Sequence, residues 1–211
     1  MTHYTLAELG WNHLLQQQWS DPESADQYPV RVVAVHRSGW VVASEQGETT
    51  VTPIVAGDER PTTVGDWLIY DPEQGRVVQR LDRKSLFKRR APGTDRSEQL
   101  IAANIDTLLA VSSCNQDFNE ARIERYLALA HDAEVMPVVV LTKADLVDDV
   151  TTFVSAAARL SPGLLVEAVN ALDPDSLQCL DPWLDSGQTI ALLGSSGVGK
   201  STITNTLMGE A

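Results

Sequence analysis

The sequence predicts two domains of different fold class: an all-β barrel, followed by an α/β domain built on a parallel sheet. Between residues 30 and 81, short runs rich in valine and other strand-forming residues alternate with turn signals. From residue 106 onward, apolar strand-like runs alternate with amphipathic helical runs, which is typical of a parallel sheet with helices on both faces. The 211 residues suffice for one large or two small domains, each with its own core.

Residues 1–27 are expected to form a helix and a linker. A short amphipathic helix is predicted over residues 5–19, where four leucines fall near one side. The polar stretch SDPESADQYP follows, and its two prolines are typical of a linker. We expect the helix to anchor this segment to the domain that follows, with partner binding as the alternative.

Residues 28–90 are predicted to form the barrel. Turn signals such as Ser38-Gly39 and Gln74-Gly75 separate five short strands: RVVAV, WVVAS, TTVTPIV, DWLIYD and RVVQRL. An OB-fold is the expected architecture, and an SH3-like barrel is the alternative. OB-folds often bind nucleic acid, but the fold alone does not establish function.

A basic run ends the predicted barrel. From Arg76 to Arg90, seven basic residues stand against the single acid Asp82, although the whole chain has a net charge of −13. One interpretation is a solvated linker, and the other is a surface that contacts the phosphate backbone of RNA. Phe87 is the only aromatic residue of the run, so base stacking has weak support. The predicted RNA-binding residues are Arg83, Lys84, Lys88, Arg89 and Arg90.

Residues 91–104 are predicted to be a connector, and residues 105–211 the α/β domain. Strands are expected at DTLLAVSS, VVVLT, LLVEAV and TIALL. The continuous apolar run VVVLT is typical of a parallel strand that is buried on both faces. Helices are expected from near Asn119, from Val150 to Ser161, over roughly residues 174–184, and after a glycine-rich loop near the end of the chain.

This glycine-rich loop carries the strongest motif. The stretch GSSGVGKS matches G-x-x-x-x-G-K-[ST], with an apolar strand before it and a helical run after it. Glycines let successive backbone N–H groups point at phosphate oxygens, and the helix N-terminus adds a positive dipole end. Lys200 is expected to reach the β- and γ-phosphates of a nucleotide, and the Ser201 hydroxyl to bind Mg²⁺. The predicted phosphate-binding residues are Gly194, Ser195, Ser196, Gly197, Val198, Gly199, Lys200, Ser201 and Thr202.

A second motif follows the predicted strand VVVLT. It consists of Thr142, Lys143 and Asp145 in the pattern T-K-x-D, at the carboxyl end of a parallel strand, where such sheets bind ligands. One carboxylate can accept hydrogen bonds from both N1–H and the 2-amino group of guanine, whereas adenine offers neither donor there. We therefore predict that Asp145 selects guanine, while the aliphatic stem of Lys143 lies along the base. Taken alone, the motif also fits an ordinary acid at a helix N-terminus.

Together the two motifs resemble those of the P-loop GTPases, whose guanine-specificity motif is N-K-x-D. Thr142 stands where that family has Asn, and its hydroxyl cannot make both amide bonds, which implies weaker base affinity. Asn170-Ala171 resembles the S-A loop of those proteins, so the backbone N–H of Ala171 is implied to point at guanine O6. Asp145 precedes Gly194, the reverse of the usual order, so the resemblance is to a circularly permuted GTPase.

Several short motifs are similar, in content and order, to the RsgA/YjeQ family of GTPases that depend on the small ribosomal subunit. They are Gly65-Asp66-Trp67, Arg83-Lys84-Ser85, Ala103-Asn104-Ile105-Asp106, Glu124-Arg125-Tyr126-Leu127, TKADL and GSSGVGKST. The resemblance implies a cytoplasmic enzyme that hydrolyses GTP to GDP and phosphate with Mg²⁺. It also implies a role in late maturation of the small (30S) ribosomal subunit, with ribosomal RNA contacted by the barrel.

Members of that family continue past the helix that follows the glycine-rich loop. The switch I threonine, the D-x-x-G of switch II and a zinc-binding domain with Cys and His ligands are expected after residue 211, and Zn²⁺ is expected only there. The predicted GTPase domain is therefore incomplete at its C-terminus. We expect the 211-residue chain to bind nucleotide but to hydrolyse it poorly.

The composition disfavours several classes of function. No apolar run approaches the length of a membrane span, and the first residues lack the pattern of a secretory signal. Cys114 and Cys179 stand far apart, which suggests a reducing compartment and no zinc site within these residues. The net charge of −13 argues against indiscriminate binding to nucleic acid, and no DNA partner is expected. Two alternatives to a GTPase stay open: another P-loop ATPase or kinase, and a non-enzymatic OB-fold RNA-binding assembly factor.

Overall fold

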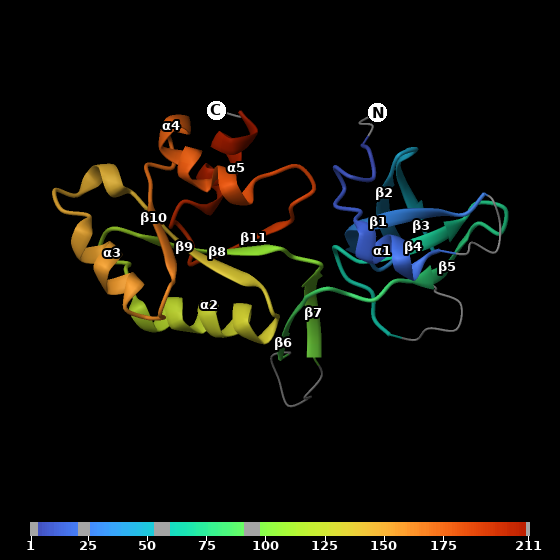
Figure 1. Ribbon diagram of the computed structural model, residues 1–211, viewed down its shortest axis with the longest axis horizontal. Coiled ribbons are helices and arrows are strands. Elements are labelled where there is room, and N and C mark those ends of the chain that lie inside the picture. The colour runs from blue at the N-terminus through green and yellow to red at the C-terminus, as the bar shows by residue number, and fades with distance from the viewer. Residues whose placement is uncertain (1–3, 21–25, 53–59, 91–97, 210–211) are drawn as a thin grey trace. The chain divides into compact units, whose positions relative to one another are not determined.

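The computed structural model describes residues 4–20, 26–52, 60–90 and 98–209, and for Arg90 the backbone alone (Figure 1). The chain divides into two compact units, Met1–Ile105 (unit 1) and Asp106–Ala211 (unit 2). Each unit has its own sheet and its own core, so each is described by itself. Within the described part of the chain, no helix has the length and apolar character that crossing a bilayer requires.

The N-terminal segment forms a shorter helix than the sequence predicts. Helix α1 spans His13–Gln18, and residues 6–10 form turns instead. The break has a local cause, because Gly10 adopts a φ of +88° and the side chain of Asn12 caps the start of α1. The prediction of one helix over residues 5–19 is therefore wrong: the leucine spacing is helical, but a glycine and a cap divide it.

This segment contributes apolar side chains to the core of unit 1. Leu9 and Leu15 are buried in a cluster that includes Trp67 of the sheet. The Trp11 and Trp67 rings meet edge to face, with 5.0 Å between their centroids. The guanidinium of Arg31 lies 5.7 Å from the centroid of the Trp67 ring and donates to Leu9 O at 2.5 Å. These contacts attach the segment to the sheet.

Unit 1 is built on a five-stranded antiparallel sheet in the order β3-β2-β1-β4-β5. All five predicted strands are present: β1 (Tyr28–His36), β2 (Gly39–Ser44), β3 (Gly47–Val51), β4 (Trp67–Asp71) and β5 (Arg76–Arg80). One face of the sheet buries a cluster made of Val30, Val32, Trp40, Val42, Val51, Leu68 and Val77. The predicted third strand runs on to Val55, but residues 53–59 lie outside the described part. Among the described residues no hydrogen bonds join β3 to β5, so closure into a barrel stays a prediction.

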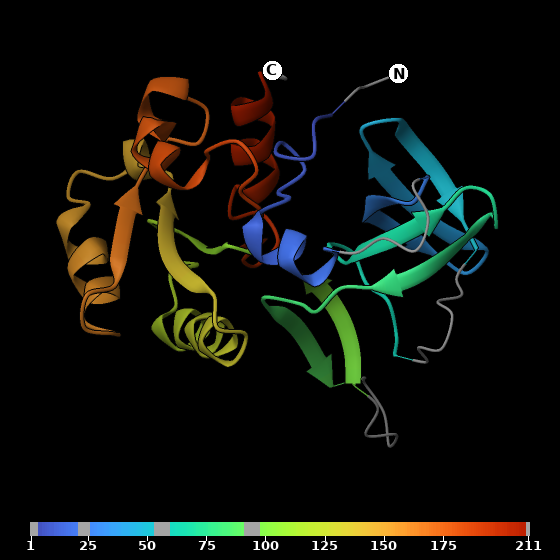
Figure 2. The same cartoon turned by 45° about the vertical axis from the view of Figure 1, so that its right-hand side comes forward.

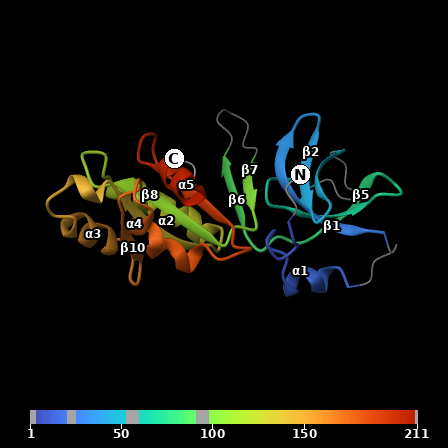
Figure 3. The same cartoon turned by 90° about the horizontal axis from the view of Figure 1, so that it is seen from above.

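Two further strands, β6 (Leu86–Arg90) and β7 (Glu98–Ala103), form an antiparallel ribbon (Figure 3). Strand β7 lies inside the predicted connector 91–104, so that prediction is wrong from residue 98 onward. The segment EQLIAA carries a weak strand signal, and it becomes a strand because it pairs with β6. Residues 91–97 lie outside the described part of the chain.

Gly65 joins the ribbon to the sheet of unit 1. Next to it, Val64 forms an isolated parallel bridge with Ala102. Gly65 has a φ of +89°, and a Cβ built on it would lie 2.0 Å from the carbonyl oxygen of Ala103. Glycine is therefore required here both for its backbone conformation and for the close approach of β7.

Unit 2 contains a four-stranded parallel sheet in the order β10-β9-β8-β11. The predicted alternation of strands and helices is confirmed by β8 (Thr107–Ser113), α2 (Glu120–Asp132), β9 (Met136–Thr142), α3 (Thr151–Ala158), β10 (Leu165–Ala168), β11 (Ile190–Leu193) and α5 (Lys200–Met208). Figure 2 shows β9 and β10 side by side and pointing the same way. The stretch predicted as one helix over 174–184 is instead α4 (Pro174–Leu177) followed by the 3₁₀ helix η2 (Gln178–Trp183).

Helices cover both faces of this sheet. On one face, Leu109 and Val140 pack with Leu177 of α4 and Ile203 of α5. On the other face, Ala110 and Leu141 pack with Ile123 of α2, and in Figure 1 α4 and α5 lie above the sheet and α2 below it. Because successive residues of a strand point to opposite faces, the continuous apolar runs supply both cores. Because the strands are parallel, the carboxyl ends of β9, β10 and β11 meet at one edge of the sheet, where the predicted motifs lie.

Candidate functional site

The glycine-rich loop leads from β11 into α5, as the motif predicts. Gly197 and Gly199 have φ values of +78° and +102°, in the left-handed region that favours glycine. Gly194 approaches β8 so closely that a Cβ built on it would lie 2.5 Å from Val111 O. The glycines of the motif therefore have separate structural reasons: two allow the turn, and one allows close packing against the neighbouring strand.

Lys200, the first residue of α5, folds back over this loop. Its Nζ donates hydrogen bonds to Gly194 O at 2.9 Å and to Ser195 O at 2.8 Å. An ammonium group has three N–H donors, so one stays available for a phosphate oxygen. The neighbouring residues Ser201 and Thr202, in the first turn of α5, line the pocket that is described below.

Thr142, at the end of β9, links the sheet to the glycine-rich loop. Its hydroxyl lies 2.5 Å from Val198 O in the loop and 3.1 Å from Ser112 O at the end of β8, and the residue is fully buried. A hydroxyl has a single proton, so it can donate to only one of these carbonyls at a time. The threonine at this position is thus a structural tie between the two predicted motifs.

Lys143 and Asp145 follow directly on a tight turn. Lys143 has a φ of +60°, an unusual left-handed conformation for a residue with a side chain, and it precedes the 3₁₀ helix η1 (Ala144–Leu146). The turn is held to the residue that follows β10 because Ala144 N donates to Val169 O at 3.2 Å. This conformation presents Asp145, which is exposed, to the pocket.

The loop after β10 forms the third wall. Asn170 accepts a hydrogen bond from Leu172 N through its side chain, at 3.0 Å, and donates its own N–H to Ser176 Oγ at 2.9 Å. Thr206 of α5 donates its hydroxyl to Ala171 O at 2.8 Å. The loop is therefore held by both its own turn and the helix of the phosphate motif.

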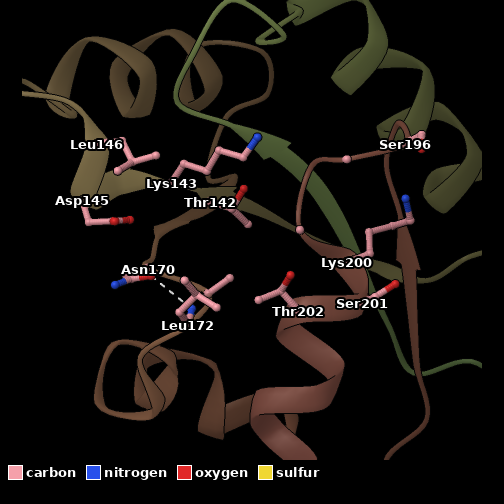
Figure 4. Close-up of a pocket in the computed structure, with 13 residues that line it drawn as sticks. Thr142, Lys143, Asp145, Leu146, Asn170, Leu172, Ser196, Lys200, Ser201 and Thr202 are labelled. Atoms are coloured by element: carbon pink, nitrogen blue, oxygen red, sulfur yellow. Dashed lines mark hydrogen bonds between the residues drawn. The ribbon is translucent and has the colours of Figure 1, made fainter. Parts of the chain in front are cut away.

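These three segments enclose one pocket of about 480 Å³ (Figure 4). In Figure 4, Asp145 and Asn170 lie toward one end, and Lys200 and Ser201 lie toward the other. Nearly all the predicted phosphate- and base-binding residues line it. The lining consists of Thr142, Lys143, Asp145, Leu146, Asn170, Ala171, Leu172, Ser196, Gly197, Gly199, Lys200, Ser201 and Thr202. The predicted residues Gly194, Ser195 and Val198 support the loop from outside this lining.

The sequence interpretation missed two apolar residues of the pocket. Leu146 and Leu172 are 72% and 76% exposed, although large apolar side chains usually lie inside. Both stand at the end that holds Asp145, and a flat aromatic ring is the kind of ligand that such side chains cover. Their positions directly after Asp145 and after Asn170-Ala171 could have indicated them.

Arg83, one of the predicted RNA-binding residues, forms an ion pair within unit 1. Its Nε and Nη2 donate to the two carboxylate oxygens of Asp66, at 2.6 and 2.8 Å. The Asp66 side chain is fully buried, and it also accepts from Thr63 N at 2.8 Å. The charge of Arg83 is thus already matched by a protein carboxylate, which assigns it a structural role.

The rest of the basic run lies on or next to the ribbon. Lys88 Nζ forms an exposed ion pair with Glu98 at 2.9 Å, and Arg89 Nε donates to Gln99 at 3.0 Å. Lys84 is exposed and precedes β6. The side chain of Arg90 lies outside the described part of the chain. The structure therefore places these residues together on one ribbon but leaves their charges partly compensated.

The described residues contain no group of three His, Cys, Asp or Glu side chains arranged to hold a metal ion. Cys114, just past the end of β8, is fully buried. Burial raises the pKa of its thiol to about 11, so it is protonated at neutral pH and is a poor nucleophile.

Comparison with known proteins gives consistent relatives. The family model described as RsgA GTPase matches residues 80–211. The small ribosomal subunit biogenesis GTPase RsgA 2 of Vibrio parahaemolyticus is 48% identical over 209 residues, covering 99% of this chain and 58% of that protein. The protein named small ribosomal subunit biogenesis GTPase RsgA in Mesorhizobium japonicum is 44% identical over 207 residues, covering 98% of this chain and 59% of that protein. The chain thus spans less than two thirds of the length of these relatives.

Two solved structures are similar in fold. YjeQ from Thermotoga maritima has a TM-score of 0.68 at 24% identity, covering 86% of this chain and 65% of that one. YloQ, described as a circularly permuted GTPase, has a TM-score of 0.65 at 23% identity, covering 87% of this chain and 65% of that one. The fold, the order of the motifs and the sequence relatives agree. The chain belongs to the RsgA GTPase family.

Proposed function

We propose that unit 2 binds a guanine nucleotide in the pocket that the three loops enclose. The observation that carries this proposal is the convergence of the T-K-x-D turn, the Asn170-Ala171 loop and the glycine-rich loop on one pocket. Separately each motif has an ordinary structural explanation. Their meeting at the carboxyl ends of parallel strands is the arrangement in which such sheets bind nucleotides.

At one end of the pocket, Asp145 reads the base. Its carboxylate accepts two hydrogen bonds from guanine, and an adenine there would leave the carboxylate unpaired. Leu146 and Leu172 cover the ring, together with the stem of Lys143. The backbone N–H of Ala171 binds guanine O6.

At the other end, the glycine-rich loop and the first turn of α5 hold the phosphates. The backbone N–H groups and the helix dipole favour negative charge, and Lys200 adds a full positive charge. Ser201 supplies a hydroxyl oxygen of the kind that Mg²⁺ prefers, and it lines the pocket at this end, so the residues present fit the ion. When bound, Mg²⁺ neutralises part of the phosphate charge.

The whole protein, we propose, hydrolyses GTP to GDP and phosphate during assembly of the small ribosomal subunit. The names of its relatives in Vibrio parahaemolyticus and Mesorhizobium japonicum support this proposal. Unit 1, proposed as an OB-like barrel, contacts ribosomal RNA through Lys84 and the ribbon residues Lys88, Arg89 and Arg90. Arg83 contributes by fixing the loop before the ribbon.

Residues 1–211 on their own are expected to hydrolyse GTP slowly. The described polar side chains at the phosphate end are those of Ser196, Lys200, Ser201 and Thr202. None of them is a base or an amide that could orient an attacking water, and hydrolysis depends on such a group. Single-turnover GTP cleavage at the rate of a full-length relative would contradict this expectation.

Nucleotide competition tests the proposed function. GTP and GDP should bind residues 1–211, and ATP should compete only weakly. Asp145→Asn should weaken GDP binding and improve xanthosine diphosphate binding, because the amide offers a donor to the xanthine 2-oxo group. Asp148→Asn is the matched control, since Asp148 is an exposed acid of the same loop that does not line the pocket. Preference for ATP would favour the alternative of a P-loop ATPase or kinase, and unchanged selectivity in Asp145→Asn would remove the assignment of guanine.

A further inference from the structure

Helix α2 makes a side-chain contact with the glycine-rich loop that neither motif predicts. Arg122, in the first turn of α2, donates from Nη1 to Ser195 Oγ at 2.8 Å. The two residues are 73 positions apart in the chain and both side chains are partly buried. The backbone of Arg122 is itself fixed, because its N–H donates to the capping side chain of Asn119 at 2.8 Å. The side chain of Arg122 therefore extends from a capped first turn of α2.

Ser195 also accepts a hydrogen bond from Lys200. Its carbonyl accepts from Lys200 Nζ at 2.8 Å, while its hydroxyl accepts from Arg122. A line of hydrogen bonds thus runs from α2 through Ser195 to the lysine. Arg122 is not among the residues that line the pocket.

We propose that Arg122 is a positioning residue that fixes the phosphate-binding loop from outside the pocket. The loop contains two glycines in left-handed conformation, Gly197 and Gly199, and such a segment has several accessible backbone states. A charged hydrogen bond that holds Ser195 reduces this freedom before the nucleotide arrives, and preorganisation of this kind increases affinity. The inference rests on the proposed function, because it concerns the phosphates of the same nucleotide.

The effect should depend on the phosphates of the ligand. Arg122→Ala should weaken GDP binding about five- to tenfold, because only part of the free energy of one charged hydrogen bond acts on binding. Binding of guanosine, which has no phosphate, should stay unchanged. Both affinities can be measured by competition against a fluorescent GDP derivative, with thermal unfolding of each variant as the test of folding.

Four further variants complete the experiment. Ser195→Ala should weaken GDP binding by a similar factor, and the double variant should be no worse than either single one, because both remove the same bond. Arg122→Lys should restore part of the affinity. Arg159→Ala is the matched control: Arg159 is an exposed arginine at the end of α3 in the same unit, and its loss should leave GDP binding unchanged.

Three results would overturn the inference alone: unchanged GDP affinity in Arg122→Ala, an equal loss of GDP and guanosine binding, or loss of folding in Arg122→Ala with full affinity in Arg122→Lys and Ser195→Ala. The second and third results would mean that Arg122 supports the whole unit instead of the loop. If the unmodified chain fails to bind GDP, the proposed function falls and this inference falls with it.

Discussion

The basic run of unit 1 and the glycine-rich loop of unit 2 both suggest phosphate binding in the sequence, yet the fold uses their charges differently. In the run, Arg83 is matched by the buried Asp66, and Lys88 is paired with Glu98. In the loop, Lys200 is held by backbone carbonyls, which position the ammonium without neutralising its full charge. A motif that specifies backbone conformation therefore predicts local structure more closely than a count of charges does.

The largest effect should follow from breaking the buried pair in unit 1. Asp66→Ala should lower the free energy of unfolding of unit 1 by about 3–5 kcal/mol, because it leaves Arg83 without its carboxylate and Thr63 N without its acceptor. Urea unfolding followed by tryptophan fluorescence reports mainly on unit 1, which holds four of the five tryptophans (Trp11, Trp19, Trp40 and Trp67), while Trp183 lies in unit 2. Glu98→Ala, which breaks the exposed pair with Lys88, should change it by less than about 1 kcal/mol. Equal effects of the two changes would mean that the Arg83–Asp66 pair stabilises unit 1 no more than the Lys88–Glu98 pair does.

Removing the charge of the loop should affect binding instead of folding. Lys200→Ala should weaken GDP binding by about 2–3 kcal/mol, or roughly thirty- to 150-fold, because a charged donor to the phosphates is lost. Lys88→Ala, which removes the same charge from the ribbon, should leave GDP affinity unchanged. Isothermal titration calorimetry measures the GDP affinity of both variants. A comparable loss of affinity in Lys88→Ala would mean that the lysine of the loop contributes no more to GDP binding than a lysine of the ribbon.

The tie between the two motifs of unit 2 should have an intermediate effect. Thr142→Val keeps the shape of the side chain but removes the hydroxyl, so Val198 O loses its donor inside the protein. We expect a loss of about 1–2 kcal/mol, in both GDP affinity and the free energy of unfolding of unit 2. Thr142→Asn offers two N–H donors for Val198 O and Ser112 O, and it should bind GDP at least as tightly as the unmodified chain. Weaker binding by the asparagine variant would show that the site is fitted to threonine.

The two exposed leucines that we propose cover the base, Leu146 and Leu172, should have the smallest effect. Leu172→Ala should weaken GDP binding by about 0.5–1 kcal/mol, since part of the apolar surface over the ring is removed. The free energy of unfolding should not change, because the side chain is 76% exposed. Leu207→Ala, on the exposed side of α5 and outside the pocket, is the control. A fall in stability for Leu172→Ala would assign Leu172 to the core instead.

The parts of the molecule that the sequence predicted well have local causes. The glycine-rich loop is determined by Gly194, Gly197 and Gly199, each of which meets a steric need that can be recognised from the motif. The parallel strands were recognised because apolar residues run without interruption through segments such as VVVLT. Both signals lie within a few neighbouring residues.

The parts that were missed depend on contacts between distant residues. Strand β7 exists because it pairs with β6, and its own sequence gives a weak signal. The partner of Arg83 lies seventeen positions earlier, at Asp66, and nothing in the basic run identifies it. Arg122 was missed for the same reason, since its contact with Ser195 spans 73 positions. The exception is α1, where Gly10 and Asn12 gave a local signal that the leucine spacing obscured.

The hydroxyl of Thr142 and the carbonyl of Val198 have a consequence for the order in which this unit matures during translation. Thr142 is synthesised 56 residues before Val198, because β9 precedes the glycine-rich loop in the chain. Before Val198 is synthesised, Ser112 O is the one of these two carbonyl partners that the Thr142 hydroxyl can reach. A nascent chain can therefore form the turn at Lys143 before the tie to the glycine-rich loop closes, and a ligand of that loop can assist only the final stage of its folding.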